Sequence, residues 1–425
     1  VTGIQRRSKR SGWKIDHLNK GESPFKGEEP GLAELIERVV KKGTFSVTDD
    51  TSIYKKADAI LITVQTPVDE DHRPKYESLR QVSAEIGEKM KNGSLIVVES
   101  TVAPGTTNYI VKPILEDNSG MTAGKDFNLV FSAERVMLGR LLFNLQKLTR
   151  IVGGLTPQCT ERGIELYSHI VEAEILPTDC LTAEVAKVTE NTYRDVNIAF
   201  ANEVALICES LGVNVYDVRR FVNTLPNITT DPAKNPLRMM HIPGAGVGGH
   251  CLPKDPWLLK HGLDAYGAFK IEPRIIIESR KTNDYMPLHM RELIEGALGE
   301  LGRGLKGARI TILGFAFLEN SDDTRNTPAL QLYNLLKEEG SDVVVHDPYV
   351  RDYEGIEIIN DLNEALRDSD GIAVVTRHEE YKKLTPSWLK ERMRTPVIID
   401  GRNTYNRGDF LDAGFTFRGV GLPRK

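Results

Sequence analysis

Residues 59–64 read Ala59-Ile60-Leu61-Ile62-Thr63-Val64, a short apolar run rich in β-branched side chains. Two further runs of this kind follow, Ser94-Leu95-Ile96-Val97-Val98 and Asn128-Leu129-Val130-Phe131, with amphipathic stretches between them. Continuous apolar strands that alternate with helices indicate a parallel sheet covered on both faces. The pattern stops after Arg150-Ile151-Val152-Gly153-Gly154, and the sequence therefore predicts an α/β domain over residues 1–178.

Strand-like runs return in the last third of the chain and predict a second sheet. They are Ile310-Thr311-Ile312-Leu313, Val343-Val344-Val345, Ile372-Ala373-Val374-Val375 and Val397-Ile398-Ile399. Between the sheets, residues 182–211 and 273–298 have helical apolar spacing. The expected buried face of the first helix contains Ala183, Ala186, Ile198, Ala201, Ala205 and Cys208. We therefore expect two Rossmann-like parallel-sheet domains joined by a central helical domain, with boundaries 1–178, 179–300 and 301–425.

The start of the sequence departs from the usual dinucleotide-binding pattern. Such a domain normally opens with a strand, a Gly-x-Gly-x-x-Gly turn and a helix whose N-terminus holds the pyrophosphate. These 425 residues begin on what looks like the second strand, so a first βα unit is expected to be absent from them. The acid that normally binds the ribose is replaced by Gln5, followed by Arg6-Arg7-Ser8-Lys9-Arg10. Arginine near this position can accommodate the extra phosphate of NADP, and a solvated basic turn is the alternative interpretation of the same residues.

The composition excludes several classes of function. Fifty-five basic and sixty acidic residues leave a net charge of −5, which offers no general attraction to nucleic acid or anionic membranes. The four cysteines show no metal-ligand spacing and are expected to be thiols in a reducing compartment. No apolar run has the roughly twenty residues that a membrane helix needs, and Val1-Thr2-Gly3-Ile4 does not begin a signal peptide. We expect a cytoplasmic protein without a metal.

The strongest chemical signal is the segment Gly244-Ala245-Gly246-Val247-Gly248-Gly249-His250-Cys251-Leu252-Pro253-Lys254-Asp255. Its glycines allow a tight turn that approaches a ligand closely and places the thiol of Cys251 at a fixed point. A nearby cation such as Lys254 would lower the pKa of the thiol, and Asp255 would orient a water molecule. The alternative is an inert cysteine beside a structural loop, since most cysteines act as small apolar residues.

This segment resembles the motif G-x-G-x-G-G-[SH]-C-x-x-x-D of the UDP-glucose/GDP-mannose dehydrogenases, and the resemblance extends over nearly the whole chain. The His250 form is similar to the branch that acts on UDP-N-acetyl-hexosamines. The resemblance implies that Cys251 is the nucleophile, and that Gly246, Gly248 and Gly249 approach the substrate. It also implies a UDP-sugar-binding role for the C-terminal domain, in which Arg325 offers a planar cationic fork to phosphate.

Further candidate residues lie on other elements. Lys187 and Asn191 stand four residues apart on one helical face, which a solvated surface would also show. The resemblance implies that they stabilise negative charge on the C6 oxygen of the substrate. Glu134 lies in the segment 131–139 after a strand and is implied as a base or a water-activating carboxylate, although an ordinary strand-end carboxylate would look the same. Arg135 in this segment departs from the commoner family pattern.

Two strand exits are expected to line the cofactor. They are Val64-Gln65-Thr66-Pro67 and Glu99-Ser100-Thr101-Val102-Ala103-Pro104-Gly105, and each alone could be a simple turn. By resemblance Thr66 and Pro67 contact the cofactor, and Thr101 lies near the nicotinamide and the catalytic water. With Gln5 and Arg6 they complete the expected cofactor site. NAD is the expected cofactor, and NADP use is left open.

The resemblance implies a four-electron oxidation of the C6 hydroxyl of UDP-N-acetylmannosamine or a related UDP-N-acetyl-hexosamine. Hydride leaves C6, Cys251 adds to the aldehyde, a second hydride leaves a thioester, and water hydrolyses it, organised by Thr101, Glu134 and Asp255. UDP-glucose 6-dehydrogenase, UDP-N-acetylgalactosamine dehydrogenase and a non-catalytic nucleotide-sugar-binding protein are the alternatives. A two-electron hydroxyacid dehydrogenase needs no thiol and has no second α/β domain. The apolar helices 182–211 and 273–298 predict a homodimer or a larger homo-oligomer.

Overall fold

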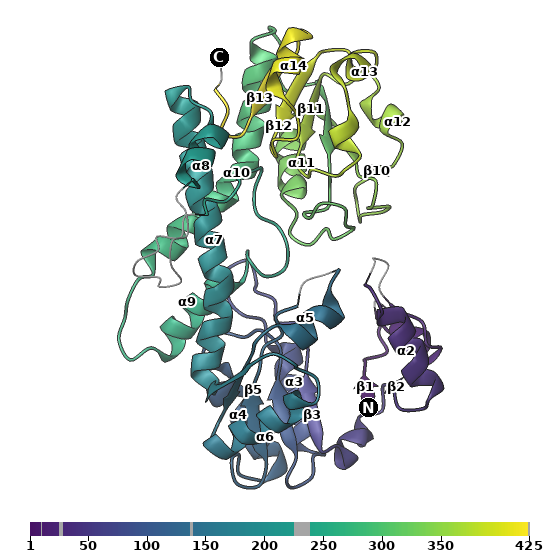
Figure 1. Cartoon of the computed structure of the whole chain (residues 1–425), viewed down its shortest axis with the longest axis vertical. Coiled ribbons are helices and arrows are strands. Elements are labelled where there is room, and N and C mark those ends of the chain that lie inside the picture. Colours follow the sequence, from purple (N-terminus) through teal and green to yellow (C-terminus); the bar gives the residue numbers. More distant parts are fainter. Residues whose placement is uncertain (10, 25–28, 137–138, 225–238, 424–425) are drawn as a thin grey trace. The chain divides into compact units, whose positions relative to one another are not determined.

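The computed structural model describes residues 1–9, 11–24, 29–136, 139–224 and 239–423 of the chain (Figure 1). These residues form two compact units. The N-terminal unit comprises residues 1–190 and 257–272, and the C-terminal unit comprises residues 191–256 and 273–425. The predicted three-domain boundaries stay predictions.

The main sheet of the N-terminal unit has the strand order β3-β4-β5-β6-β7. Its strands are β3 (Ala59–Ile62), β4 (Leu95–Val98), β5 (Asn128–Phe131), β6 (Arg150–Gly154) and β7 (Ile175–Asp179). All neighbouring strands are parallel except β5 and β6, which are antiparallel. The chain turns back at the end of β5 through the short helix α5 (Leu141–Lys147) and makes no crossover, which a parallel pair would need.

The burial of β4 shows why this sheet is covered on both faces. Ile96 and Val98 pack with residues of α3 (Glu77–Gly87) and α4 (Lys112–Ser119). Leu95 and Val97 point to the other face and pack with α6 (Pro157–Ser168). Since successive side chains of a strand alternate between faces, all four residues of β4 are buried, as the apolar run predicted.

A separate two-stranded parallel sheet is formed by the first residues of the chain. It pairs β1 (Thr2–Ile4) with β2 (Ser46–Thr48), and the helices α1 (Trp13–Asn19) and α2 (Leu32–Lys41) connect them. Two short turns of helix follow elsewhere in this unit, η1 (Thr51–Lys56) and the π-helical η2 (Thr107–Val111), which leads into α4.

The C-terminal unit contains a six-stranded sheet with the order β10-β9-β8-β11-β12-β13, and every pair is parallel. The strands are β8 (Arg309–Leu313), β9 (Asp342–His346), β10 (Ile358–Ile359), β11 (Gly371–Val374), β12 (Val397–Asp400) and β13 (Thr416–Gly419). The connecting helices are α11 (Pro328–Glu338), α12 (Leu362–Leu366), η3 (Tyr381–Lys383), α13 (Pro386–Lys390) and α14 (Arg407–Asp412). The strand order reverses between β8 and β11, which is where such sheets bind ligands at their carboxyl edge.

Two long helices confirm the predicted helical stretches. They are α7 (Cys180–Leu211) and α10 (Arg274–Gly299), and the shorter α8 (Val215–Val222) and α9 (Asp255–Tyr266) accompany them. Of the expected buried face of α7, Ala183, Ala201, Ala205 and Cys208 are buried. Among the described residues, no helix combines the length and the apolar character needed to cross a membrane.

Candidate active site

The glycine loop, residues 244–249, lies in the C-terminal unit and is packed too closely for larger side chains. A Cβ added to Gly248 would lie 2.5 Å from Phe317 Cβ. Gly249 has a φ of +91°, a conformation that other residues rarely adopt. The glycines therefore let this loop pass directly against the segment 314–328, which follows β8.

Hydrogen bonds fix the loop at both ends. At its start, Gly244 N donates to Asn202 Oδ1 at 3.0 Å. At its end, Gly249 N donates to the carbonyl oxygen of Arg325 at 2.8 Å, and Asn326 Nδ2 donates to Gly249 O at 3.0 Å. The predicted substrate-binding glycines and Arg325 thus belong to one connected structure.

A buried polar network between α7 and α10 supports the start of the loop. Asn202 Nδ2 donates to Asn283 Oδ1 at 2.9 Å, and Asn283 Nδ2 donates to Asp195 Oδ1 at 2.8 Å. Arg280 and Asp195 form a buried ion pair at 2.5 Å. The Asn202 side chain therefore joins this network to the glycine loop.

Cys251 is the exposed cysteine of the four, since Cys159, Cys180 and Cys208 are buried. Its carbonyl oxygen accepts hydrogen bonds from Lys254 N at 3.0 Å and from Asp255 N at 2.8 Å. These bonds close a turn that leads directly into α9. The turn holds the backbone that bears the thiol in place and leaves its side chain accessible to a substrate.

Asp255 is fully buried and joins two other candidate residues. Its Oδ2 accepts a hydrogen bond from Asn191 Nδ2 at 2.6 Å, and its Oδ1 lies 2.9 Å from Lys254 Nζ. Lys254 and Asp255 form an ion pair. The buried Lys254 ammonium makes no hydrogen bond to another described residue. Lys254 therefore balances the charge of the buried Asp255 carboxylate, and the Asn191 amide keeps a second N–H beyond its bond to Asp255.

The electrostatics next to the thiol involve residues from two segments. Burial lowers the pKa of His250, and the positive charges of Lys254 and Arg325 lower it further. Hydrogen bonds to Asp323 raise the pKa of Arg325, and the Coulombic interaction with Cys251 adds to this. Arg325, which the sequence had suggested only for phosphate, is therefore a cation that acts on Cys251, and the neutral form of His250 is favoured.

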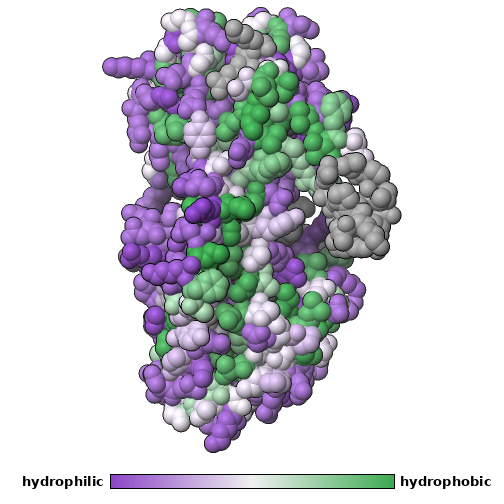
Figure 2. All heavy atoms as spheres, turned by 90° about the vertical axis from the view of Figure 1, so that its left-hand side faces the viewer, coloured by the Kyte–Doolittle hydropathy of each residue, from purple (hydrophilic) through white to green (hydrophobic). Residues whose placement is uncertain are grey.

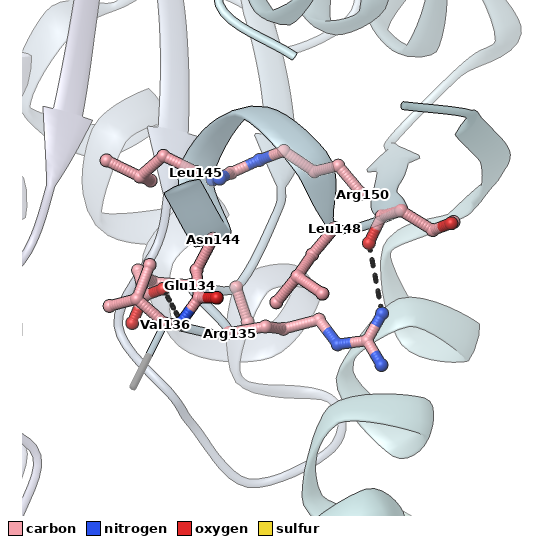
Figure 3. Close-up of a pocket in the computed structure, with 9 residues that line it drawn as sticks. Glu134, Arg135, Val136, Asn144, Leu145, Leu148 and Arg150 are labelled. Carbon is pink, nitrogen blue, oxygen red and sulfur yellow. Dashed lines mark hydrogen bonds between the residues drawn. The ribbon is translucent and has the colours of Figure 1, made fainter. Parts of the chain in front are cut away.

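The remaining chemical candidates lie in the N-terminal unit, around the loop after β5 (Figure 3). Glu134 is half-buried, and burial raises its pKa, while a hydrogen bond from Val136 N and the charges of Lys187 and Arg150 oppose the rise. Met137 and Leu138 of this segment lie outside the described residues. The carboxyl group thus has the raised proton affinity that suits a base or a water-activating group.

Arg135 links this loop to α7. Its Nε and Nη2 donate to the two carboxylate oxygens of Glu190 at 2.9 and 3.0 Å, and its Nη1 donates to Thr149 O at 3.0 Å. Arg135, Glu190 and Lys187 line a small pocket next to β5. In Figure 3 the Arg135 side chain extends away from the Glu134 carboxylate. Arg135 therefore fixes the loop through these bonds, and it lines the pocket of Figure 3 together with Glu134.

The predicted cofactor-lining exits of β3 and β4 lie side by side. Thr66 Oγ1 donates to Thr101 O at 2.5 Å, and Ser100 Oγ donates to Val64 O at 2.7 Å. Pro67 follows Thr66, and its carbonyl oxygen accepts a hydrogen bond from Lys75 N at 2.8 Å. The two loops are thus joined at the carboxyl edge of the sheet, where dinucleotides bind.

At the end of β1, Gln5 Nε2 donates to Ser11 Oγ at 3.1 Å, and the Arg6 side chain is exposed. Arg7 pairs with Asp49 at 3.1 Å. Arg10 lies outside the described residues. Arg7 is therefore used in local pairing, and Arg6 and Lys9 are exposed basic side chains of this segment.

The structure brings the predicted residues together in two groups. In the C-terminal unit the group contains Asn191, Gly246, Gly248, Gly249, Cys251, Asp255 and Arg325. In the N-terminal unit it contains Thr66, Pro67, Thr101, Glu134 and Lys187. In the described part of the chain, no cluster of His, Cys, Asp or Glu side chains has the form of a metal site. Together these features define an α/β protein that has a parallel sheet in each unit and an exposed cysteine directly after a tightly packed glycine loop.

Comparison with known proteins agrees with this class. Residues 10–171, 181–285 and 311–407 match the NAD binding domain, the central domain and the UDP binding domain of the UDP-glucose/GDP-mannose dehydrogenase family. The UDP-N-acetyl-D-mannosamine dehydrogenase of Pyrococcus horikoshii is 36% identical over 92% of this chain and 88% of its own. That of Escherichia coli K12 is 32% identical over 92% of this chain and 91% of its own.

A similar solved structure is named for a different sugar. The NDP-N-acetyl-D-galactosaminuronic acid dehydrogenase of Methanosarcina mazei is 43% identical, with a TM-score of 0.90, over 100% of this chain and 90% of that one. The chain belongs to the UDP-glucose/GDP-mannose dehydrogenase family. It is an NAD-dependent nucleotide-sugar dehydrogenase.

Proposed function

We propose that this enzyme oxidises the C6 hydroxyl of a UDP-N-acetyl-hexosamine to a carboxylate in a four-electron reaction through Cys251. The observation that carries the proposal is an exposed cysteine on a tightly packed glycine loop, followed by a buried aspartate that binds Asn191. A two-electron oxidation would not need this thiol.

The relatives support N-acetyl-hexosamines and divide over the configuration of the sugar. Curated relatives at 32–36% identity are named for UDP-N-acetyl-D-mannosamine, and the solved relative at 43% identity is named for an N-acetyl-D-galactosaminuronic acid. UDP-N-acetylmannosamine is our first candidate, and UDP-N-acetylgalactosamine is the second. Initial rates with both sugars and with UDP-glucose decide between them, and faster oxidation of UDP-glucose would contradict the proposal.

Each candidate residue has a distinct task in the proposed reaction. Lys187 and Asn191 hold the C6 oxygen while it carries developing negative charge. The Cys251 thiolate then adds to the aldehyde carbon, which keeps the intermediate bound until the second oxidation gives a thioester. Glu134, Asp255 and Thr101 organise the water that hydrolyses it. Arg325 stabilises the thiolate, and the glycines Gly246, Gly248 and Gly249 allow the substrate to approach the loop.

The described residues fit the nicotinamide end of NAD. The joined exits of β3 and β4 place Thr66, Pro67 and Thr101 together at the carboxyl edge of a parallel sheet. Gln5 and Arg6 at the end of β1 are the candidates for the adenosine side. NAD would supply the hydride acceptor at this edge, and each of the two oxidation steps would need one NAD molecule. NADP use and a cytoplasmic location stay predictions.

Intact-protein mass spectrometry of the Glu134→Gln variant tests the covalent route. With NAD and UDP-N-acetylmannosamine, slowed hydrolysis should leave a sugar-nucleotide adduct that peptide mapping assigns to Cys251. The double variant Glu134→Gln/Cys251→Ser is the control and should stay unmodified. An adduct on another residue, or reduced cofactor without any adduct in either variant, would refute the thioester on Cys251.

A second proposal concerns assembly, and it rests on an apolar stripe on α7. Tyr193, Phe200 and Ile207 are exposed at intervals of seven residues, and Leu211 continues the stripe. This interval places them on one face of the helix. Figure 2 shows hydrophobic side chains gathered on the side of the molecule on which α7 lies. We infer that the stripe binds a second copy of the chain.

Sedimentation velocity tests the assembly. The wild-type protein should sediment as a dimer or a larger oligomer, and Phe200→Asp/Ile207→Asp should sediment as a monomer. Leu411→Asp, at an exposed residue of α14 that is not part of the stripe, should keep the wild-type state. A wild-type monomer at micromolar concentration would contradict the inference.

A further inference from the structure

Glu184 is a fully buried carboxylate in α7 that the proposed reaction does not use. Its Oε2 accepts a hydrogen bond from Gly105 N at 2.6 Å, and its Oε1 accepts one from Thr107 N at 2.8 Å. Both donors lie where the loop after β4 enters η2. One carboxylate therefore satisfies two backbone N–H groups at the start of a helical segment, which is a favourable place for negative charge.

The loop that Glu184 holds is the one that carries Thr101. On its other side, Tyr76 OH accepts a hydrogen bond from Ala103 N at 2.7 Å, and Thr106 Oγ1 donates to the same oxygen at 3.1 Å. The hydrogen bonds of Glu184 differ from those of Tyr76 because Glu184 belongs to α7, where it lies three residues before Lys187 in the sequence. Glu184 therefore connects the turn of α7 that carries Lys187 to the loop that carries Thr101, and all three residues lie in the same unit.

The conformation of Gly105 shows that the loop is held in one arrangement. Gly105 has a φ of +92°, and a Cβ there would lie 2.5 Å from Tyr266 Cδ2. Only glycine fits this position, and its N–H points at Glu184. A loop with a glycine at a positive φ has other conformations open to it when that hydrogen bond is lost.

We propose that Glu184 is a positioning residue that, in its ionised form, holds the Thr101 loop in register with the Lys187 turn of α7. The inference rests on the proposed function, because it assigns the loop and the helix to one catalytic site. Glu184 acts through the backbone of Gly105 and Thr107 and does not touch the substrate.

Ionisation matters because only a carboxylate offers two oxygens that both accept without carrying a proton. Protonation would place an O–H against one of the two N–H donors. Burial raises the pKa of Glu184 to about 7, the hydrogen bonds from Thr107 and Gly105 oppose the rise, and the charge of Asp179 adds to it. The other titratable groups that face Glu184 are Cys180, Tyr76 and Tyr266, and the negative charge of Glu184 raises their pKa values.

Steady-state kinetics from pH 5.5 to 9 test this role, with Glu184→Gln compared with wild type. Glutamine has the charge and nearly the shape of the protonated residue. Wild-type kcat should fall on the acidic side with a midpoint near 7. Glu184→Gln should lack this limb and should have at least a tenfold lower kcat at pH 8.5, with KM changed less than kcat. A variant that keeps the wild-type limb or the wild-type kcat at pH 8.5 would overturn the proposal.

Two control variants separate this effect from a general loss of structure. Glu161→Gln, at an exposed glutamate on α6, should leave the profile unchanged. Tyr76→Phe removes the other tie to the loop without removing an ionisation near pH 7, so it should lower kcat at every pH and keep the limb. Loss of the limb in Tyr76→Phe would show that it does not come from Glu184.

Hydrogen exchange of the wild-type peptide that covers residues 101–107 gives a readout that needs no activity and no variant. After correction for intrinsic exchange rates, protection should decrease as the pH falls through about 7. Protection that does not change from pH 8 to pH 6 would overturn the proposal. If wild type oxidises no nucleotide sugar, the proposed function fails, and the exchange result still decides whether Glu184 holds the loop.

Discussion

Gly248→Ala tests whether close packing of the glycine loop positions Cys251. The new Cβ would lie 2.5 Å from Phe317 Cβ and 3.0 Å from Asn326 O. Both atoms belong to or adjoin the backbone, so they cannot rotate away. The loop must therefore move by about 1 Å to restore an ordinary contact distance, and overpacking of this kind costs typically about 1–3 kcal/mol of stability. Since misplacement by about 1 Å can reduce a rate by about 100-fold, we expect kcat to fall by about that factor.

The assay is the steady-state rate of NAD reduction with a nucleotide sugar, together with the thermal midpoint of unfolding. Gly296→Ala is the matched control, because a Cβ at Gly296 in α10 would meet nothing within 4 Å. It should keep the wild-type kcat and stabilise the helix by up to about 1 kcal/mol. A kcat of Gly248→Ala within about threefold of wild type would refute the reasoning, because the loop would then have room that the structure does not give it.

Three further predictions test other parts of the structure. Asn202→Ala leaves Gly244 N without its acceptor and Asn283 Oδ1 without its donor, and it should lower the free energy of unfolding by about 1–3 kcal/mol; an unchanged midpoint in urea unfolding would contradict this. Arg135→Glu and Glu190→Arg should each lower kcat severalfold, and the double variant should recover part of it, whereas additive losses would show that the ion pair does not position the loop. Burial lowers the pKa of His346 to about 4 from about 6.5, so the stability it contributes is lost as the pH falls below about 6.5. Between pH 7.5 and pH 5 this amounts to about 2 kcal/mol, and urea unfolding of His346→Gln should lack that part of the pH dependence.

Local sequence patterns predicted the elements because burial leaves a direct trace in them. The four apolar residues of β4 are buried on both faces, and the helical spacing of residues 182–211 corresponds to α7. The antiparallel pairing of β5 and β6 was not predicted, because it depends on the path of the connection between them and not on the composition of either strand.

The polar residues on the buried side of α7 were also missed. Glu184, Thr192, Asp195 and Glu209 are buried, although residues of these types usually lie on exposed helix faces. Each needs a partner from another element, as Glu184 has in the loop after β4. A single sequence does not reveal such partners. Their spacing along the sequence could have indicated that they are buried, since it places them on the same helical face as the buried alanines.

The sequence suggested which residues form the candidate site, and it revealed few of the contacts between them. The spacing from Cys251 to Asp255 is local, and the structure keeps both on one turn. The hydrogen bond between Asn191 and Asp255 joins residues 64 positions apart, and the interaction of Arg325 with Cys251 spans a similar distance in the sequence. These contacts depend on how the elements pack, and therefore only the structure assigns them.

The most direct test of the proposed reaction is the number of NAD molecules reduced per UDP-N-acetylmannosamine consumed, in wild type and in Cys251→Ser. The four-electron route predicts two reduced cofactors per sugar in wild type and loss of this stoichiometry in the variant. One reduced cofactor per sugar in wild type, or an unchanged ratio of two in the variant, would contradict oxidation through a thioester on Cys251.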